Sequence, residues 1–572
     1  MSYRSIWCVD FEYQHDPGEN PSPVCMVARD ILSGAKYRVW REELNSMKLP
    51  PYDLDSNSLF VCFYAPAELS CHLVLGWPFP TNILDLFAEF RNKTNGLNPN
   101  CGNGLVGALA YHGIDSIGAA EKDAMRQKIM SGGPWSAEEK QEILDYCESD
   151  VIALERLMGK IFGEIDIPRA LQRGRYMKAV SKIEHCGVPI DLELLGRLKH
   201  EWDGIKDQLI KNVDSKYGVF EGSSFRSDLW GNWLIKNKIP WPRLDSGRLA
   251  LDDETFRQMA RAYPTVAPIR ELRDSLSKMR LADLEVGVDG RNRCMLSPFR
   301  SKTGRNQPSN SRFIYGPSVW LRGLIRPENG MAIAYLDWSQ QEFGIAAGLS
   351  VDPVMMEAYS SGDPYLAFAK QAGAIPPEGS KETHSAIRDQ FKACVLAVQY
   401  GMGEISLATR LGRSIERARE LLTLHRKTFR KFWAWSDAVQ DYAMLHNRLW
   451  TTFGWNLFIE DKSNPRSLRN FPMQANGAEM LRFACCYLTE AGIRVCAPVH
   501  DAILIEAPAN EIEEITRFSQ ALMAKASEVV LSGFSLRSDA KIVRFPDRYQ
   551  DPRGKVMWDE VMGLLTYETA SC

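Results

Sequence analysis

The chain has 572 residues and a mass of 64.7 kDa, so it exceeds the size of one ordinary hydrophobic core and corresponds to roughly four domain-sized units. Hydrophobic residues make up 45% of it and charged residues 25%, which is typical of a globular protein and excludes a disordered or fibrous one. The formal net charge is −3, so any binding of nucleic acid must depend on local clusters of Lys and Arg.

Cysteine and histidine usage predicts no zinc site, because the 13 cysteines include no CxxC pair and the 9 histidines no HExxH motif. Such usage is typical of a reduced, intracellular chain. Residues 1–12 lack the apolar core of a signal peptide, and no uninterrupted apolar stretch has the length of a bilayer span. We therefore expect a cytoplasmic protein with no membrane partner.

The N-terminal part alternates strand and helix patterns. Apolar runs at 5–13 and 58–66 predict strands, and the i, i+3, i+4, i+7 spacing at 138–162 predicts an amphipathic helix. This first α/β unit is expected to end near residue 165.

Helical periodicity continues from residue 166 to about 284, for example at 174–185, and predicts a helical arm. A polar, Gly- and Pro-rich segment at 297–318 follows. The apolar run MAIAYLDW at 331–338 is then typical of a buried strand, and it indicates that a second α/β domain begins there.

Residues 346–444 are again mainly helical, and they contain an excess of basic side chains, namely Arg410, Arg413, Arg417, Arg419, Arg426, Lys427, Arg430 and Lys431. By itself, such a run is more often a solvated helix face than a nucleic-acid contact. The chain then returns to strands at 493–500 and 502–508, which predict a hairpin that turns at His500 and Asp501.

Carboxylates gather in the N-terminal unit. Asp10 and Glu12 lie two apart in the first strand, so the pleat points both toward one face. Tyr146 and Asp150 lie four apart in the predicted helix and share one helix face, and Glu68 follows the second strand. Each pair alone is typical of an ordinary surface. The ordered set indicates a cation site, because crowded carboxylates repel one another unless divalent cations neutralise them.

The chemistry of this set follows from its oxygen ligands. Carboxylates suit Mg²⁺ or Mn²⁺, and two such ions roughly 4 Å apart can activate a water molecule and stabilise the leaving oxygen of a phosphodiester. We therefore expect hydrolytic phosphoryl transfer from the N-terminal unit.

The segments VDFE, YAPAE and YCESD resemble the DEDDy carboxylate set of the proofreading 3′-to-5′ exonucleases. The resemblance implies that Tyr146 orients the attacking water and that three acids bind metal, namely Asp10, Glu12 and Asp150. The family's middle acid is normally Asp. Here Glu68 takes that catalytic position, with Asp85 as the alternative, and its extra methylene implies altered metal geometry or weaker activity.

A second pair of acids lies far apart in the sequence. Asp337 ends the strand at 331–338, and Asp501 follows another strand, so the two can share a pair of cations if these strands are neighbours. Either Asp alone is more often a turn residue or a helix N-cap.

Between these acids, the helical run RDQFKACVLAVQYG places four residues on one slowly drifting stripe, namely Arg388, Lys392, Leu396 and Tyr400. Two cations followed by an aromatic ring suit a triphosphate and a stacked base. An ordinary amphipathic helix with snorkelling Lys and Arg gives the same pattern.

The order of these features resembles the family A DNA polymerases, the group of bacterial DNA polymerase I. DWSQQE at 337–342 resembles their motif A, the RxxxKxxxxxxxYG helix their motif B, and VHDA at 499–502 their motif C. TGRNQPSN at 303–310 is similar to the TGR segment of the family, and RSLRNFPMQ at 466–474 to its template-primer-binding segment. Together with the exonuclease pattern, the resemblance covers nearly the whole chain.

The resemblance implies a role for each matching residue. Asp337 and Asp501 would hold two Mg²⁺ ions, or Mn²⁺ in their place, with the Trp338 carbonyl as a further ligand. Arg388 and Lys392 would contact the β- and γ-phosphates of a dNTP, and Lys392 would also protonate the departing pyrophosphate. The rest of the dNTP site would comprise Leu396, Tyr400, Glu342 and Gln340, with Tyr400 and Glu342 excluding a ribose 2′-OH. Residues lining the minor groove or primer terminus of bound DNA would be Gln340, Arg305, Arg466, Asn470, Gln474 and His500.

Several positions depart from the family pattern. Ala502 stands where the family usually has Glu, so the second carboxylate of motif C is missing. Leu396 occupies a position that is commonly aromatic, Trp338 and Gln341 replace the usual Tyr and Ile, and Tyr365 stands where His is typical. These departures imply a nucleotide pocket of unusual selectivity.

These features predict an α/β and α+β multidomain fold, in which an RNase H-like exonuclease domain precedes a right-hand polymerase. The expected domains are the exonuclease at 1–165, the thumb and connecting helices at 166–284, the palm at 285–345 and 445–572, and the fingers at 346–444. The predicted function is template-directed DNA synthesis with 3′-5′ proofreading, by a monomer whose partners are primer-template DNA and dNTPs.

Only nine residues precede Asp10, which leaves no room for a 5′ nuclease domain and favours a phage replicative enzyme that acts in the host cytoplasm.

Two alternatives follow from the departures. Ala502 and Glu68 are also compatible with a non-catalytic DNA-binding or scaffolding protein on a degenerate polymerase body. In the second alternative the chief activity is nuclease, and the polymerase body only holds substrate. Primer extension with Mg²⁺ and four dNTPs separates both from a polymerase.

Overall fold

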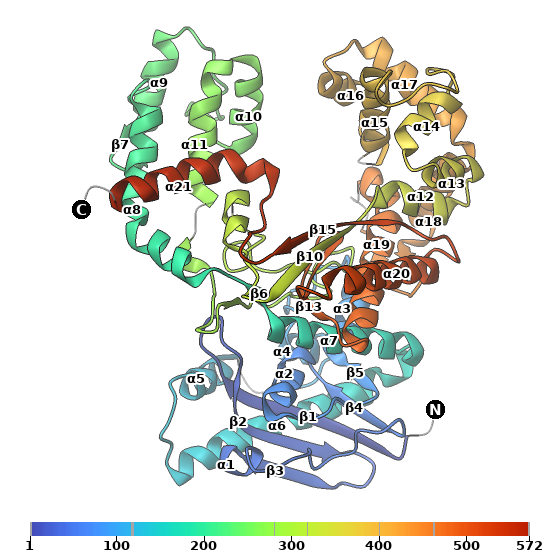
Figure 1. Cartoon of the computed structure of the whole chain (residues 1–572). Helices are drawn as coiled ribbons and strands as arrows, with labels where there is room; N and C mark the ends of the chain where they lie inside the picture. Colours follow the sequence, from blue (N-terminus) through green and yellow to red (C-terminus); the bar gives the residue numbers. More distant parts are fainter. Residues whose placement is uncertain are drawn as a thin grey trace. The chain divides into compact units, whose positions relative to one another are not determined.

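The computed structural model describes residues 3–115, 119–278, 281–316, 318–399, 401–460 and 464–569. The chain forms two compact units. The first comprises residues 1–186, 296–307 and 333–542, and the second comprises residues 187–295, 308–332 and 543–572. Figure 1 shows the helices and strands of both in chain order.

The N-terminal part of the first unit is built on a five-stranded sheet with the order β3-β2-β1-β4-β5. The strands are β1 (Ser5–Gln14), β2 (Ser22–Asp30), β3 (Lys36–Trp40), β4 (Ser58–Cys62) and β5 (Ile83–Asp85). β1 runs antiparallel to β2 and parallel to β4. Its helices are α1 (Arg41–Leu44), α2 (Pro66–Leu75), α3 (Leu86–Thr94), α4 (Leu105–Tyr111), α5 (Ala119–Met130), α6 (Ala137–Ile161) and α7 (Ile167–Cys186), with the 3-10 turn η1 (Phe162–Glu164).

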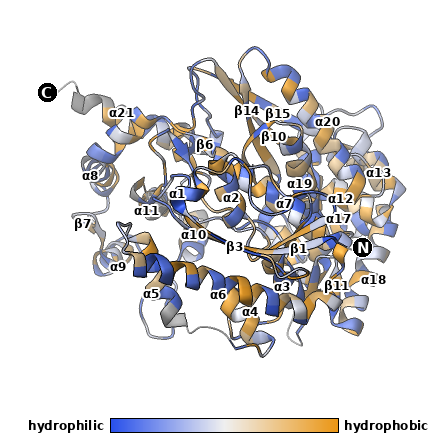
Figure 2. Cartoon of the chain, turned by 90° about the horizontal axis from the view of Figure 1, so that it is seen from below, coloured by the Kyte–Doolittle hydropathy of each residue, from blue (hydrophilic) through white to orange (hydrophobic). Residues whose placement is uncertain are grey.

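The sequence pattern explains how β1 and α6 form. Val9 and Phe11 of β1 are buried, whereas Asp10 and Glu12 on the opposite side of the pleat are half-buried. α6 begins at a capping box formed by Ser136 and Glu139, and it packs against β1 and β2. Figure 2 shows both hydrophilic and hydrophobic residues on α6, as an amphipathic helix requires. The predicted first strand and long helix are therefore present.

A second sheet of four strands has the order β13-β14-β10-β15. Its strands are β10 (Met331–Trp338), β13 (Arg494–Val499), β14 (Ala502–Pro508) and β15 (Ser538–Arg544). β13 and β14 pair antiparallel and turn at His500 and Asp501, so the predicted hairpin is confirmed. The long helices α19 (Pro465–Glu490) and α20 (Ile512–Val530) pack against each other beside this sheet (Figure 1).

The segment between β10 and α19 is mainly helical, as its periodicity predicts. It contains α12 (Gln341–Ser350), α13 (Pro353–Ser360), α14 (Pro364–Gln371), α15 (Ser385–Gln399), α16 (Glu404–Leu411), α17 (Ile415–Thr428) and α18 (Arg430–His446). The two short strands β11 (Arg448–Trp450) and β12 (Asn456–Phe458) pair antiparallel and lead into α19.

The second unit is mostly helical. Its helices are α8 (Leu192–Asp214), α9 (Ser227–Lys236), α10 (Asp253–Ala262), α11 (Ala267–Lys278) and α21 (Lys555–Thr569), with 3-10 turns η2 (Pro264–Val266), η3 (Leu281–Asp283), η4 (Val319–Leu324) and η5 (Pro552–Gly554). Two-stranded pairs join β6 (Val188–Pro189) to β9 (Arg291–Asn292) and β7 (Phe220–Glu221) to β8 (Ser224–Phe225). Trp230 is fully buried in a small aromatic core formed mainly by α9, α10 and α11, and it stacks on Trp233.

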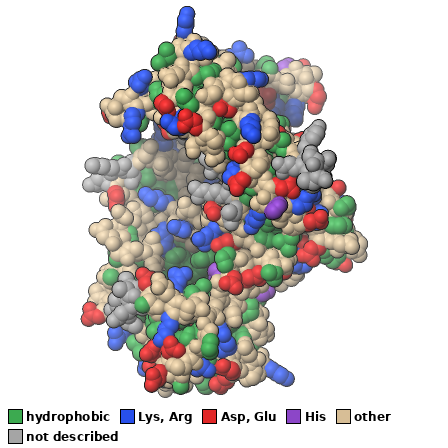
Figure 3. Space-filling view, turned by 90° about the vertical axis from the view of Figure 1, so that its left-hand side faces the viewer, with side chains coloured by type: hydrophobic (Ala, Val, Ile, Leu, Met, Phe, Trp, Pro, Cys, Tyr) green, Lys and Arg blue, Asp and Glu red, His purple; other side chains and the backbone are tan. Residues whose placement is uncertain are grey.

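The mixed α/β and multidomain fold expected from the sequence is confirmed. α7 belongs to the first unit, where it packs against α2, β5, α19 and β13, so the expected helical arm at 166–284 spans both units. Among the helices that the structure describes, none is both long enough and apolar enough to cross a lipid bilayer. Figure 3 shows Lys and Arg side chains interspersed with Asp and Glu side chains over one face.

Candidate active sites

The two acids far apart in the sequence lie on adjacent parts of the second sheet. Asp337 is near the end of β10, and Asp501 immediately precedes β14, the strand paired with β10. Burial raises the pKa of Asp337 to about 6, and the negative charges of Asp501 and Asp539 contribute to the rise. Asp501 therefore lies close enough to Asp337 for their charges to repel each other.

Two neighbours hold the Asp501 carboxylate. A guanidinium nitrogen of Arg305 lies 3.3 Å from its Oδ1 atom. Gln341, at the start of α12, is 4% exposed, and in the amide orientation that satisfies its polar atoms its nitrogen donates to both Asp501 oxygens at 3.0 and 3.1 Å. Arg305 thus contacts a candidate catalytic acid as well as being a predicted DNA contact.

The backbone at this site has an unusual conformation at two positions. Gln340 has φ of 48° and His500 has φ of 55°, both in the left-handed region that residues other than glycine rarely adopt. Such strained positions often occur at functional sites, because the surrounding fold fixes them there. Both flank the candidate acids, which ties the local strain to the place where Asp337 and Asp501 meet.

Asp539 on β15 is a third acid that the sequence interpretation did not identify. β15 is paired with β10, and Asp539 accepts a hydrogen bond of 2.6 Å from Ser339 Oγ. Its charge contributes to the raised pKa of Asp337. Only the pairing of β15 with β10 brings Asp539 to this site, and the spacing of acids along the sequence gives no signal of it.

The predicted phosphate-binding residues lie on α15. Arg388 forms an ion pair of 2.6 Å with Asp363, whereas Lys392 is exposed. Their charged groups lie 5.5 Å and 5.8 Å from the centre of the Tyr365 ring. Leu396 is half-buried further along the helix, and the predicted base-stacking residue Tyr400 lies outside the described residues.

Glu342, on α12, interacts electrostatically with Asp501 and with Tyr365 of α14. Its pKa is raised by burial and by the negative charge of Asp501, while Arg305 lowers it. The charge of Glu342 in turn contributes to the raised pKa of Tyr365. The structure therefore brings Asp501, Glu342 and Tyr365 into one electrostatic neighbourhood.

The predicted DNA contacts on α19 share one helix face. Arg466, Asn470 and Gln474 follow one another at intervals of four residues, and their exposure falls from exposed at Arg466 to half-buried at Gln474. His500 is exposed in the turn that carries Asp501. These side chains remain accessible to a ligand within the first unit.

The N-terminal acids form a second cluster. Oxygens of Asp10 and Glu12 and the sulfur of Cys147 lie within 4.8 Å of one another, and Cys147 Sγ is 3.4 Å from Asp10 Oδ2. The pKa of Asp10 is raised to about 8 by burial and by Asp150, and that of Glu12 is raised by burial and by Asp10. Burial, followed by the charges of Asp150, Glu12 and Asp10, raises the pKa of Tyr146. The predicted residues from β1 and α6 are thus brought together.

Glu68 and Asp85, the two candidates for the middle acid, have different environments. Asp85 caps α3, and its oxygens accept backbone N–H bonds from four residues, namely Tyr64, Ala65, Phe87 and Ala88. Glu68 is 3% exposed in the first turn of α2, and its Oε2 atom has no hydrogen-bond partner among the described residues. Burial and the charge of Asp10 raise its pKa. Glu68 is therefore the acid with oxygen free to serve a ligand.

Both acid clusters have the chemistry of divalent-cation sites. Hard carboxylate oxygens are the ligands that Mg²⁺ and Mn²⁺ prefer, and raised pKa values to which neighbouring acids contribute show that negative charge is in excess. The unpartnered Oε2 atom of Glu68 agrees with this interpretation. The residues present therefore fit divalent cations at both places.

Residues 310–542 match the sequence profile of DNA polymerase family A, and this match supports a family A DNA polymerase. The matched segment contains β10, α15, α19 and the β13–β14 hairpin, so it includes Asp337 and Asp501. A solved structure of the polymerase domain of Pol1 from M. smegmatis, in complex with DNA primer-template and dNTP, shares the fold with a TM-score of 0.72 and 17% identity. It covers 94% of this chain, and this chain covers 95% of it.

Three curated relatives are DNA polymerases. DNA polymerase I of Aquifex aeolicus is 24% identical over 402 residues, which are 66% of this chain and 67% of that protein. A thermostable DNA polymerase I of Thermus thermophilus is 25% identical over 69% of this chain, and the match spans 50% of the Thermus protein. The DNA polymerase of Mycobacterium phage D29 is 24% identical over 473 residues, which are 80% of this chain and 74% of the phage protein.

Proposed function

We propose that the chain is a DNA-directed DNA polymerase that adds dNTPs to a primer 3′ end. The observation that carries the proposal is the proximity of Asp337, on β10, and Asp501, in the turn before the adjacent strand β14, within the segment that matches family A. Primer-template DNA and dNTP are proposed as partners, in line with the contents of the M. smegmatis structure. The match to the phage D29 polymerase over 80% of the chain supports a phage-type enzyme.

The proposed mechanism assigns one task to each group. Asp337 and Asp501 would hold two Mg²⁺ ions, whose chemistry when bound is to lower the pKa of the primer 3′-OH and to stabilise charge on the phosphates. Arg388 and Lys392 would bind the triphosphate, and Arg388 would exchange Asp363 for a phosphate oxygen. Lys392 would donate its proton to the departing pyrophosphate. Catalysis would then rest mainly on positioning and on charge neutralisation.

The test is primer extension by wild type and the Asp501→Asn variant, with four dNTPs and Mg²⁺. Loss of one of two acids that hold cations should reduce extension by at least about 10³-fold while single-strand digestion continues. Extension by the variant at the wild-type rate would overturn the assignment. A wild-type chain that binds primer-template but never extends it would instead support a non-catalytic DNA-binding protein.

A second activity, 3′-5′ exonuclease, is favoured by the N-terminal cluster. Asp10, Glu12 and Asp150 would hold divalent cations, Glu68 would complete the set, and Tyr146 would orient the attacking water. Asp10→Asn should stop degradation of a primer 3′ end and leave extension unchanged, because the two acid clusters belong to different sheets. Continued degradation by this variant would contradict the nuclease assignment.

A further inference from the structure

A lysine lies inside the N-terminal acid cluster. The ammonium group of Lys122, on α5, is 2.5 Å from Asp150 Oδ1, and the two side chains are only 18% and 12% exposed. The same ammonium group lies 5.7 Å from the centre of the Tyr146 ring. α5 packs against β1 and α6, the two elements that bring the cluster together. Lys122 is therefore held among the predicted nuclease residues by its own helix.

Lys122 supplies positive charge where negative charge is in excess. Its charge lowers the pKa of Asp10 and of Glu12, opposing the effects of burial and of the neighbouring acids. Three acids, Asp10, Glu12 and Asp150, share this one ammonium group, so a single positive charge offsets only part of the repulsion. An ammonium group and a divalent cation both bind carboxylate oxygen, and the Asp150 oxygen that pairs with Lys122 cannot at the same time coordinate a metal ion fully.

We propose that Lys122 is the internal counter-ion of the nuclease cluster, and that a divalent cation must displace its ammonium group from Asp150 in order to bind. The inference rests on the proposed nuclease function. Lys122 acts through Asp150 as a positioning residue, because it holds this carboxylate in place until the cation takes over. The ion pair then sets how much Mg²⁺ or Mn²⁺ the nuclease cluster needs.

The proposal predicts opposite effects for two substitutions. Lys122→Met removes the competing charge but keeps an unbranched side chain of similar length, so Mn²⁺ should bind roughly tenfold more tightly. Lys122→Arg keeps a cation at the same place, so its Mn²⁺ affinity should stay within about twofold of wild type. A lysine that only braces α5 against α6 predicts the reverse order, because its loss would loosen Asp150 and weaken Mn²⁺ binding.

Mn²⁺ binding is measured by isothermal titration calorimetry on the full chain, in an Asp337→Asn/Asp501→Asn background that removes the other acid pair. Addition of Asp10→Asn to this background serves as the reference in which nuclease-cluster binding is lost. Tighter binding by Lys122→Met, with Lys122→Arg unchanged, supports the proposal. Unchanged or weaker binding by Lys122→Met overturns it and leaves the nuclease function standing.

Hydrogen exchange gives a readout that does not depend on the affinity. Because the cation breaks the ion pair between α5 and α6, Mn²⁺ should speed exchange in α5 of the wild-type chain and leave α5 of Lys122→Met unchanged. Slower exchange in wild-type α5 on Mn²⁺ addition would contradict displacement. If adding Asp10→Asn does not reduce the Mn²⁺ binding of the background variant, the N-terminal acids bind no Mn²⁺. The nuclease assignment and this inference then both fail.

Discussion

At the residue scale, the ionised carboxylate of Asp10 destabilises the folded chain. Burial and the charge of Asp150 raise its pKa to about 8, well above the value of 3.8 for a free aspartate. The folded chain therefore holds this proton more tightly than the unfolded chain does. Binding of this proton stabilises the folded chain fully below about pH 4. This stabilisation is lost as the pH rises toward 8, where the Asp10 carboxylate must ionise among other acids.

Asp10→Asn removes this ionisation, so the variant should unfold at a higher temperature than wild type when no divalent cation is present. The difference should be small near pH 5 and grow toward pH 8, because only the wild type acquires the buried charge. Thermal unfolding across this pH range checks the prediction. Asp16→Asn, at an exposed position just beyond β1, is the control and should show no such trend. Parallel pH profiles for Asp10→Asn and wild type would contradict it.

Gln341 is a buried amide beside Asp501, at a position where the family resemblance implies an apolar side chain. It donates to both oxygens of Asp501. Gln341→Met keeps the volume and removes the donor, so Asp501 retains Arg305 but loses its fixed orientation. We expect kcat for primer extension to fall roughly tenfold with the KM for dNTP nearly unchanged, since the loss concerns the reacting geometry. Gln341→Glu should be slower still, because it places another negative charge beside Asp501.

Steady-state kinetics on a defined primer-template check this prediction, with 3′ end digestion by the same variant as an internal control. A rise in KM at constant kcat would show that Gln341 acts on nucleotide binding and not on Asp501. Equal unfolding temperatures for wild type and Gln341→Met are needed to exclude a general loss of packing.

The sequence was informative about residues whose neighbours are close along the chain. The pleat of β1 joins Asp10 to Glu12, and one turn of α6 joins Tyr146 to Asp150, so local geometry alone predicts these pairs. Lys122 and Asp539 were not predicted, because they reach the sites only through packing of α5 and pairing of β15. The sequences of α5 and β15 alone do not indicate that a charged residue in them will contact the residues of a distant site.

At the element scale, α7 illustrates why the expected arm at 166–284 does not form one body. Its periodicity resembles that of the helices that follow, yet it packs on β5 and α2 in the first unit. The close approach is made at Gly174, where a Cβ atom would lie 2.0 Å from the carbonyl oxygen of Ile83. Helical periodicity shows that a face is buried, but it does not show against which partner.

Gly174→Ala should therefore destabilise the first unit, because the added methyl group meets a strand backbone that cannot move aside. We expect a loss of about 3 kcal/mol in the free energy of unfolding, the upper end of the range for overpacking. Gly159→Ala is the matched control on α6, where nothing lies within 4 Å of a Cβ atom. That change should stabilise by about 0.5–1 kcal/mol through helix propensity. Denaturant unfolding of both variants and of wild type measures these changes in stability. If Gly174→Ala is as stable as wild type, α7 can shift away from β5.

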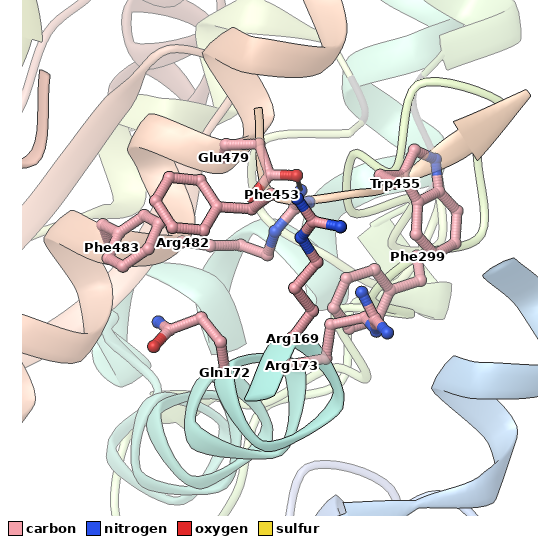
Figure 4. A pocket seen from close by; sticks show the side chains of 9 residues that line it. All are labelled: Arg169, Gln172, Arg173, Phe299, Phe453, Trp455, Glu479, Arg482 and Phe483. Atoms are coloured by element: carbon pink, nitrogen blue, oxygen red, sulfur yellow. Dashed lines mark ion pairs between the residues drawn. The ribbon is translucent and has the colours of Figure 1, made fainter. Parts of the chain in front are cut away.

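At the scale of the whole molecule, α7 links the two sheets of the first unit. It packs on β5 of the N-terminal sheet and on α19 and β13 beside the second sheet. Figure 4 shows the place where α7 faces α19, with three arginines and Glu479 among the aromatic rings of Phe299, Phe453, Trp455 and Phe483. The cavity measures about 10 Å³, room for about one water molecule, so the charges are closely packed. Arg173, Glu479 and Arg482 are buried there, whereas Arg169 is exposed, so the stability of the junction depends on the pairing of the three buried charges.

The ion pair between Arg173 of α7 and Glu89 of α3 tests how strongly this junction couples the two candidate sites. Two hydrogen bonds of 2.6 and 2.7 Å join the side chains, and each is only 7% exposed. Arg173→Met leaves Glu89 buried without its cation, so we expect a loss of about 3–5 kcal/mol. Because α7 contacts both sheets, nuclease and polymerase activities should then be lost together on heating, at one lower temperature.

Two further variants separate charge from packing. Arg173→Met combined with Glu89→Leu removes both charges from the same place, and it should recover most of the lost stability, as replacement of buried ion pairs by apolar groups often does. Arg4→Met breaks an exposed pair with Asp55 and should cost less than about 1 kcal/mol. Loss of nuclease activity at a lower temperature than polymerase activity in Arg173→Met would show that the N-terminal sheet unfolds independently. In that case α7 would connect two parts of the first unit that unfold separately, and the buried ion pair of Arg173 and Glu89 would stabilise only the N-terminal part.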